Sequence, residues 1–211
     1  MPSPDAFTAA LLQERLAGTR APEDPFAVVM PPGSERWPAL VRERITRDLR
    51  PAGVLIPVID RVAGLSVLLT QRSAELKHHA GQVSFPGGRM EAHDSDVVQA
   101  ALRETHEEVG IPPQAIAVVG YLPPMPTVTG YAVTPVVGLV GDDVSLQIDR
   151  TEVEYAFEVP LEFLLDRRNE QALEREYQGR RIPTVEFHYS GERIWGATAQ
   201  ILVQLRETLI K

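Results

Sequence analysis

Three glutamates at positions i, i+3 and i+4 carry the most specific chemical signal in the chain. They are Glu104, Glu107 and Glu108, within the segment Arg-Glu-Thr-His-Glu-Glu-Val-Gly-Ile. On an α-helix this spacing places the three carboxylates on one face, where like charges repel and weaken the helix. Binding of a hard cation would offset that repulsion, because Mg²⁺ and Mn²⁺ take oxygen ligands. In most proteins such a spacing marks only a solvent-exposed helix face. The neighbouring residues must therefore distinguish an exposed face from a metal site.

The residues upstream of the glutamates favour metal binding. Phe85-Pro86-Gly87-Gly88 forms a predicted turn whose glycines allow backbone to approach a site closely. A helix start is predicted at Asp94-Ser95, and Gly110 is predicted to end that helix. The glutamates therefore lie in the second half of a helix that follows a glycine turn.

This order of residues resembles the Nudix box of the Nudix hydrolases, in which a glycine precedes an Arg-Glu-x-x-Glu-Glu-x-Gly segment. The matching residues are Gly88, Arg103, Glu104, Glu107, Glu108, Gly110 and Ile111. The resemblance implies an α/β (α+β) fold of the Nudix type, which is an α/β/α sandwich around a mixed β-sheet. It also implies a divalent metal cofactor, Mg²⁺ or Mn²⁺.

The resemblance assigns a role to each residue of the box. Glu104 and Glu108 would be metal ligands, and Glu107 would be a third ligand, directly or through water. The carbonyl of Gly88 would add another oxygen ligand. Arg103 would orient the carboxylates without touching the substrate.

The chain departs from the box at two places. Its loop between the glycine and the helix is one residue longer, and it has no glutamate at the place of the first acidic residue of the box. Asp94 is the residue that we expect to take this place, with Glu91 and Asp96 as alternatives. Thr105 stands where an aliphatic residue is usual.

A second motif resembles one Nudix subgroup, the coenzyme A pyrophosphatases, which also have the longer loop. The motif runs Leu68-Leu69-Thr70-Gln71-Arg72-Ser73, then Leu76, His79 and Gly81-Gln82, and leads into the glycine turn. Within it lies a local basic cluster in an acidic chain, and guanidinium and ammonium groups are suited to binding phosphates. The cluster comprises Arg72, Lys77, His78 and His79. The substrate-binding positions predicted on these grounds are Arg72, Lys77, His79 and Gly87.

The subgroup resemblance implies hydrolysis of the pyrophosphate of coenzyme A or acyl-CoA to 3′,5′-ADP and (acyl-)4′-phosphopantetheine. Divalent ions on the glutamates would polarise the phosphate and lower the pKa of water. A carboxylate would accept the proton, and the residue that does so stays open. Glu107 and Glu108 are candidates in the box, and Glu152 and Glu154 are distal candidates. The predicted catalytic set is Glu107, Glu108, Arg103 and Glu152.

Two other functions compete with this prediction. A Nudix hydrolase could instead cleave ADP-ribose, a nucleotide sugar or a dinucleotide polyphosphate. A non-catalytic Nudix-fold protein could bind nucleotides and regulate a partner. Such a regulator would be expected to lose carboxylates of the box, and all three are present.

The bulk composition limits the class of protein. The chain has 211 residues, 44% of them hydrophobic, which is enough for one domain with a full core. Its net charge of −8 argues against broad nucleic-acid binding. The absence of cysteine fits a reducing cytoplasm. We see neither a signal peptide nor an apolar run of membrane-spanning length, so we expect a cytoplasmic protein with a small-molecule substrate.

Hydrophobic periodicity predicts that helices alternate with short strands. Helices are predicted over residues 7–16, 37–49, from Asp94-Ser95 to Gly110, 160–165 and 197–210. Strands are predicted over residues 54–59, 65–70, 82–85, 116–121, 133–140, 153–159, 182–189 and 193–195. Residues 18–35 are predicted to be a loop.

These elements suggest a division of the chain into two parts. Residues 1–50 would form a helical extension packed on the domain, and residues 51–211 would form the Nudix domain. The helices of the extension could cover the core or form the face of a homodimer. Trp195 is expected to pack at the final helix, and residues 121–131 could form a loop that faces the substrate.

Overall fold

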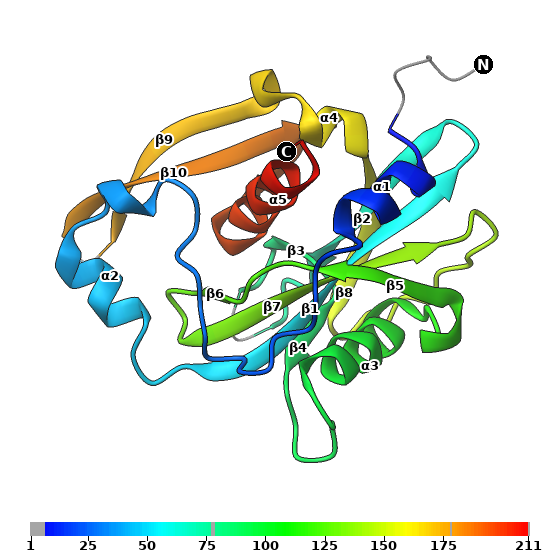
Figure 1. The fold of residues 1–211 in the computed structure, drawn as a ribbon, viewed down its shortest axis with the longest axis horizontal. Coiled ribbons are helices and arrows are strands. Elements are labelled where there is room, and N and C mark those ends of the chain that lie inside the picture. The colour runs from blue at the N-terminus through cyan, green and yellow to red at the C-terminus, as the bar shows by residue number, and fades with distance from the viewer. Residues whose placement is uncertain (1–6, 77–78, 178, 211) are drawn as a thin grey trace.

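A mixed β-sheet forms the centre of the molecule (Figure 1). The computed structural model describes residues 7–76, 79–177 and 179–210. The order of the main strands is β3-β2-β1-β7-β5, with β4 paired to β1, β6 to β7 and β8 to β2. These strands are β1 (Arg50–Arg61), β2 (Gly64–Arg72), β3 (Val83–Ser84), β4 (Gly87–Arg89), β5 (Ile116–Tyr121), β6 (Met125–Pro126), β7 (Tyr131–Val140) and β8 (Val153–Pro160). β1 and β7 are parallel, whereas β1 pairs with β2 in an antiparallel hairpin.

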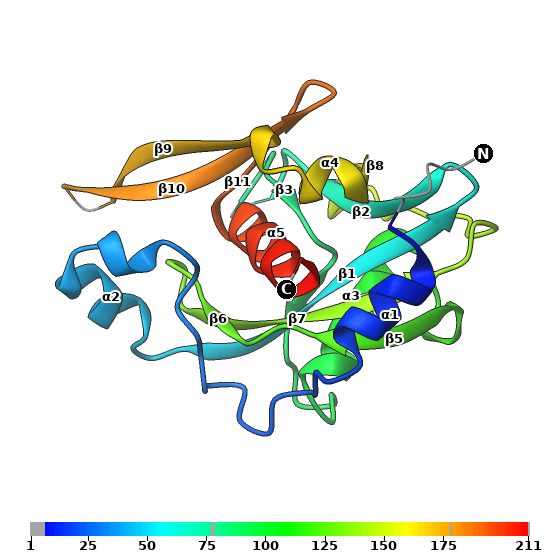
Figure 2. The ribbon, with the colours of Figure 1, turned by 45° about the horizontal axis from the view of Figure 1, so that its top comes forward.

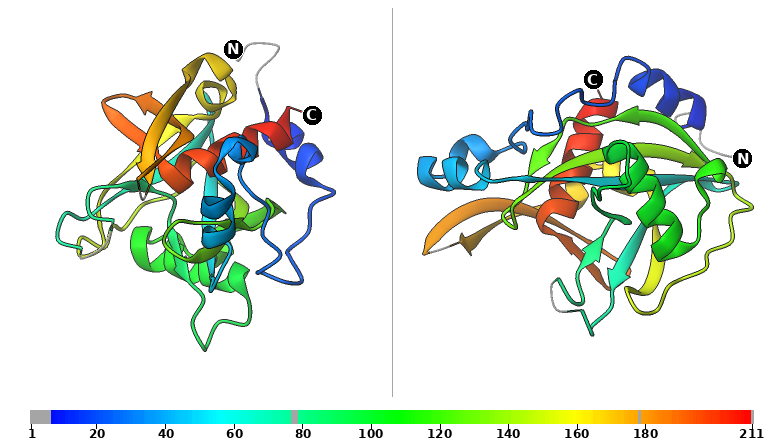
Figure 3. Two further views of the ribbon diagram at one scale, coloured as in Figure 1. Left: turned by 90° about the vertical axis from the view of Figure 1, so that its left-hand side faces the viewer. Right: turned by 90° about the horizontal axis from the view of Figure 1, so that it is seen from below.

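Helices cover both faces of this sheet, because β1 alternates its apolar side chains between two cores. Leu55 and Ile59 pack with Val109 and Ile111, at the end of α3 (Val97–Val109). Ile56 points to the opposite core, which contains α1 (Ala9–Leu16) and α5 (Gly196–Leu209). Figure 3 shows α3 and α5 on opposite sides of the sheet. The predicted α/β/α sandwich around a mixed sheet is confirmed.

A second, antiparallel sheet lies beyond α5. It has the order β11-β10-β9, and α5 contacts both β10 and β11. Figure 2 shows the long β9–β10 hairpin on the side of α5 that faces away from the main sheet. The strands are β9 (Glu170–Tyr177), β10 (Arg180–Tyr189) and β11 (Glu192–Trp195). A small apolar cluster joins this sheet to α2 (Ala39–Ile45) through Trp37, Val41, Ile45 and Ile182.

Short helical segments complete the fold. They are α4 (Leu161–Leu165) and the 3-10 turns η1 (Ser34–Arg36), η2 (Pro113–Ala115) and η3 (Arg167–Asn169). Within the described ranges, no helix has both the length and the apolar character needed to cross a membrane.

Two predicted helix boundaries were wrong. α3 is capped by Asp96, not by Asp94-Ser95, because the Asp96 carboxylate accepts hydrogen bonds from the amides of Val98 and Gln99 at 2.9 and 2.8 Å. The helix predicted over residues 37–49 is limited to α2, and Asp48 adopts a left-handed backbone with φ of 51° before β1 begins. Apolar spacing shows which residues face the core, but it does not show where the backbone leaves the helical conformation.

The sequence did not predict β9. Its segment Glu-Gln-Ala-Leu-Glu-Arg-Glu-Tyr contains mostly polar residues, and none of them is fully buried. A strand without an apolar face has no hydrophobic period by which it could be recognised. β9 is held instead by a continuous register with β10, from Glu170 opposite Phe187 to Tyr177 opposite Arg180.

One glycine sets how closely α3 packs on the sheet. Gly53 of β1 lies directly under the first turn of α3, and a Cβ at this position would overlap the Val97 carbonyl and contact the Ala101 side chain. The absence of a side chain therefore allows the helix backbone to rest on the strand backbone.

We expect Gly53→Ala to lower the free energy of unfolding by about 1–3 kcal/mol, because the added methyl group forces α3 away from β1. Urea denaturation followed by circular dichroism measures the change. Gly18→Ala is the control, since a Cβ at that position would have no other atom within 4 Å. Equal stability of the two variants would contradict the close packing of α3 on β1.

Candidate metal centre and substrate cavity

Three carboxylates lie close together between α3 and the turn that precedes β8. Glu104, Glu108 and Glu152 each offer an oxygen, and these oxygens lie within 4.8 Å of one another. Glu104 and Glu108 are neighbours at i and i+4 on α3, whereas Glu152 comes from the turn that precedes β8. The structure thus brings together two residues of the predicted metal set and one residue that was predicted as a distal catalytic carboxylate.

Backbone hydrogen bonds hold the turn of Glu152 beside α3. The amide of Asp149 donates to the carbonyl of Glu108 at 3.0 Å, and the amide of Glu152 donates to the carbonyl of Asp149 at 3.1 Å. The amide of Ser73, just after β2, donates to the carbonyl of Glu152 at 2.9 Å. The third carboxylate is therefore placed by main-chain contacts to both α3 and β2.

The glycine turn, Gly87-Gly88, packs directly against the carboxylates of Glu104 and Glu108. The amide of Gly87 donates to Oε2 of Glu108 at 3.3 Å. A Cβ on Gly88 would lie 2.5 Å from Cδ of Glu104, so any larger residue would displace that carboxylate. Gly87 has a φ of 145°, and Gly88 pairs with Gly53 across β4 and β1. Gly88 is needed because a Cβ there would meet the carboxylate of Glu104, and Gly87 is needed because its φ is positive and a Cβ there would meet the backbone of Gly53 and Val54 in β1.

Burial makes the charges of this cluster costly. The side chain of Glu108 is only 2% exposed, and this burial raises its pKa to about 8. Arg72, whose Nη1 lies 3.5 Å from Oε1 of Glu108, opposes the rise, and the charge of Glu104 adds to it. The pKa of Glu104 is also raised, mainly by burial, against the opposing effect of Arg103.

Arg103 links the cluster to a buried aspartate. Its Nε and Nη2 each donate to the carboxylate of Asp94 at 3.0 Å, and Nη1 lies 3.1 Å from Oε1 of Glu104. The hydrogen bond from Arg103 lowers the pKa of Asp94, so this buried group stays charged. Of the three acidic residues considered for this loop, Asp96 caps α3 and Glu91 pairs with Arg89, whereas Asp94 holds Arg103.

Glu107 lies outside the cluster. Its side chain is 57% exposed, and its Oε2 accepts a hydrogen bond from Nη1 of Arg103 at 3.0 Å. The i, i+3, i+4 spacing predicted one face for all three glutamates. In the structure the side chains of Glu104 and Glu108 are 15% and 2% exposed, so Glu107 is the exposed member of the three. Its role as a metal ligand, directly or through water, stays a prediction.

The donor set of the cluster fits a hard divalent cation. Three carboxylates converge, and Arg72 and Arg103 are the cations that contact them within the part of the chain that the structure describes. Mg²⁺ and Mn²⁺ bind carboxylate oxygens grouped in this way, and two of these three side chains, Glu104 and Glu108, are largely shielded from water. Glu104, Glu108 and Glu152 could hold the ion. The predicted contribution of the Gly88 carbonyl stays a prediction.

A large cavity begins beside the cluster. Its volume is about 530 Å³, within the range typical of small-molecule sites, and Arg72, His79 and Gly87 belong to its lining. His79 adopts a left-handed backbone with φ of 58°, and its Nδ1 lies 2.8 Å from Oε1 of Gln82. Lys77 and His78, the other members of the predicted basic cluster, lie outside the described residues.

Segments far apart in the sequence supply the remaining walls of the cavity. Pro31, Trp37 and Ile45 come from the segment that precedes β1, and residues 125–129 come from the loop considered as substrate-facing. Trp195 also lines the cavity, so it does more than pack at α5. Arg175 of β9 carried no sequence signal, because an arginine in a polar segment is indistinguishable from a surface residue.

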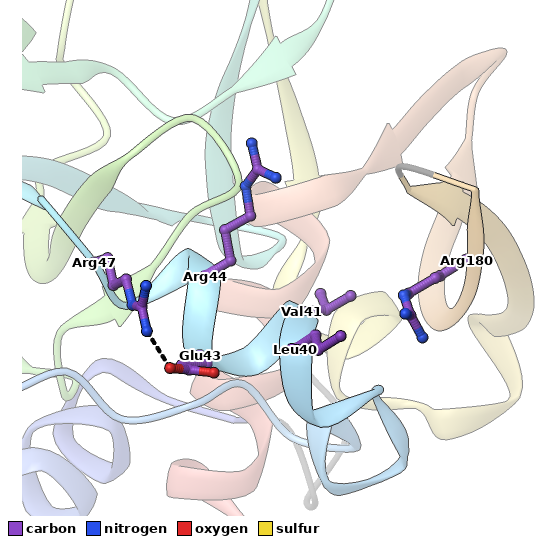
Figure 4. A pocket seen from close by; sticks show the side chains of 6 residues that line it. All are labelled: Leu40, Val41, Glu43, Arg44, Arg47 and Arg180. Carbon is purple, nitrogen blue, oxygen red and sulfur yellow. Dashed lines mark hydrogen bonds and ion pairs between the residues drawn. The ribbon is translucent and has the colours of Figure 1, made fainter.

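A second hollow, of about 450 Å³, lies between α2 and β10 (Figure 4). Figure 4 shows Arg47 paired with Glu43, while Arg180 reaches toward Leu40 and Val41 from the other side. None of the three clustered glutamates lines this hollow. The first cavity shares Arg72 with the glutamate cluster, whereas no ion pair in the described structure links a lining residue of the second hollow to those glutamates, so the first cavity is the better candidate for a reaction site.

Comparison with known proteins agrees with this geometry. Residues 49–185 match the NUDIX domain. The chain is 43% identical over 169 residues to the protein named "Uncharacterized Nudix hydrolase NudL" of Escherichia coli, covering 79% of this chain and 88% of that protein. The chain belongs to the Nudix domain family. It is thus a Nudix hydrolase by family.

Other relatives agree with this membership. The NudL protein of Salmonella heidelberg gives the same identity and coverage as the protein of Escherichia coli. A MutT/nudix family protein of known structure from Enterococcus faecalis is 16% identical with a TM-score of 0.50, covering 83% of this chain and 71% of that one. That structure supports the Nudix fold alone.

The geometry of the carboxylate cluster predicts different effects for substitutions of Glu152 and Glu107. We expect Glu152→Gln to weaken Mn²⁺ binding by at least about 10-fold, because it removes a carboxylate of the cluster. Glu107→Gln, on the exposed side of the same helix, should change the affinity by less than about 3-fold. Electron paramagnetic resonance of free Mn²⁺ measures both. A larger loss in the Glu107 variant would favour the ligand set expected from the helical spacing alone.

The raised pKa of Glu108 predicts proton release when metal binds. With a pKa of about 8, Glu108 is protonated in most metal-free molecules at pH 7, and a ligand carboxylate must lose that proton. We expect release of about one proton per ion, and an affinity that rises with pH up to about 8 and then levels off. Calorimetry in buffers of different ionisation enthalpy measures the proton count. Binding at pH 7 without proton release would show that Glu108 is already ionised.

Proposed function

We propose that this Nudix hydrolase cleaves the pyrophosphate of coenzyme A or acyl-CoA, with Mg²⁺ or Mn²⁺ as cofactor. The products would be 3′,5′-ADP and (acyl-)4′-phosphopantetheine. The supporting observation is that the carboxylate cluster shares one arginine with the large cavity: Arg72 lies 3.5 Å from Glu108 and also lines the cavity. A pyrophosphate at Arg72 would thus lie beside the metal centre, with the rest of the substrate in the cavity.

The carboxylates of Glu104, Glu108 and Glu152 would hold the cation. When bound, the ion neutralises charge on the phosphoryl oxygens and lowers the pKa of water. Arg72 would bind the substrate phosphate as well, since its Nε is buried without a hydrogen-bond acceptor in the described structure. Within the same described residues, its guanidinium has only one carboxylate neighbour, Glu108, at 3.5 Å.

Arg103 would act as a positioning residue. It reaches Glu104 while its other nitrogens are fixed by Asp94, so it sets the orientation of that carboxylate from the side of α3. Glu152 is the exposed member of the cluster, and we assign to it the proton taken from the attacking water. Glu107, Glu108 and Glu154 are the competing candidates for this step.

Turnover of coenzyme A tests the proposal. We expect the wild type with Mg²⁺ or Mn²⁺ to release 3′,5′-ADP and 4′-phosphopantetheine, separated by liquid chromatography, and Glu104→Gln to be slower by at least about 100-fold, because it removes a metal ligand. Glu108→Gln serves as the blank, and ADP-ribose is assayed in parallel.

The rates with coenzyme A and ADP-ribose distinguish a wrong substrate from a wrong reaction. Faster cleavage of ADP-ribose than of coenzyme A would support pyrophosphate hydrolysis but contradict coenzyme A as the preferred substrate. No cleavage of either compound would contradict the proposed reaction and favour a protein that only binds nucleotides.

A further inference from the structure

A second guanidinium lines the same cavity as Arg72. Arg175 belongs to β9 of the second sheet, whereas Arg72 ends β2 of the main sheet, so the two approach the cavity from different walls. Figure 2 shows β9 and β2 in separate parts of the fold. The other charged lining residue in the described part of the chain, apart from His79, is Glu176. Glu176, the next residue along β9, is exposed to solvent, whereas Arg175 is half-buried.

The contacts of Arg175 leave it short of partners. Its Nε is buried without an acceptor, and its carboxylate contact, from Nη2 to Oε2 of Glu186, is 3.6 Å long. A distance of this size exceeds a normal hydrogen bond. Glu186 is already engaged, because Arg193 donates to the same oxygen at 2.6 Å and His188 lies 2.8 Å from the other. Arg175 is therefore partly buried, charged and weakly paired.

Trp195 holds the Arg175 guanidinium in place. Cζ of Arg175 lies 4.0 Å from the centre of the indole ring, which is close stacking for a cation–π pair. Stacking occupies one face of the guanidinium and leaves the in-plane N–H groups available. Trp195 itself is fixed opposite Glu186 across β11 and β10. This arrangement provides a planar donor fixed before any ligand binds, which suits a phosphate.

We propose that Arg175, stacked on Trp195, binds the 3′-phosphate of coenzyme A while Arg72 binds the pyrophosphate. This inference rests on the proposed function and adds the feature that selects the substrate. A molecule with two separate anionic groups matches two guanidiniums on different walls of one cavity. ADP-ribose and dephospho-CoA carry the pyrophosphate but lack the 3′-phosphate, so they would leave Arg175 without its ligand.

The test compares coenzyme A with dephospho-CoA. We expect wild-type kcat/KM to be higher for coenzyme A by about 10- to 100-fold, the range for a hydrogen-bonded charged group. Arg175→Gln should reduce kcat/KM for coenzyme A by a similar factor, mainly through KM, and change that for dephospho-CoA by less than about 3-fold. For coenzyme A, the kcat/KM of Arg175→Lys should lie between those of the wild type and Arg175→Gln. Lysine keeps the positive charge but lacks the paired N–H donors of a guanidinium.

Arg181→Gln is the matched control. Arg181 lies on the neighbouring strand β10, is 82% exposed and does not belong to the cavity lining. It should leave both substrates unaffected. Calorimetry provides a readout without turnover: 3′,5′-ADP should bind the wild type more tightly than 5′-AMP, and Arg175→Gln should remove this difference.

Three results would overturn the assignment. Equal wild-type rates for coenzyme A and dephospho-CoA would remove the proposed selection. An equal loss for both substrates in Arg175→Gln would show that Arg175 supports the second sheet only. If the enzyme cleaves ADP-ribose but neither coenzyme A nor dephospho-CoA, the proposed function is refuted, and the role of Arg175 that rests on it is refuted as well.

Discussion

The burial of Glu108 beside two other carboxylates is the constraint on which the rest of the site depends. A carboxylate that is 2% exposed cannot be solvated by water, and its neighbours Glu104 and Glu152 have the same charge. The surrounding structure supplies compensation from three directions: the amide of Gly87, the guanidinium of Arg72 and the Arg103–Asp94 pair behind Glu104. This compensation is incomplete, as the raised pKa of Glu108 shows. A cation-binding function would explain why the fold tolerates such a cluster.

The same constraint explains the backbone around the cluster. Close approach of β4 to α3 requires glycine at Gly88, close approach of β4 to β1 requires glycine at Gly87, and close approach of α3 to β1 requires glycine at Gly53. The turn before β8 reaches the cluster because Asp149 and Glu152 are tied by main-chain hydrogen bonds to α3 and to the residue after β2. The metal-ligand candidates are thus fixed by backbone contacts, which hold geometry more firmly than flexible side chains do.

Local sequence pattern predicted the parts of the site that depend on local geometry. The spacing of Glu104 and Glu108 on one helix face, and the turn at Gly87 and Gly88, follow from helical periodicity and from the freedom of glycine. The position of Glu152 beside Glu104 and Glu108 could not be predicted in this way. It depends on the hydrogen bond between Asp149 and Glu108, which joins segments that are distant in the chain. Arg175 was missed because the polar strand β9 carries no hydrophobic period.

The proposed binding of substrate by Arg175 would place part of the recognition on the second sheet, away from the carboxylate cluster. The carboxylate cluster and Arg72 lie within residues 49–185, which match the Nudix domain, and they are attached to the main sheet. The cavity also uses residues outside that match, including Trp37 before β1 and Trp195 at the start of α5. A substrate anchored by Arg72 at one wall and by Arg175 at the other would span both sheets. Its specificity would then be set largely by segments that carry no box residue, which is why a short catalytic motif reveals the reaction class more readily than the substrate.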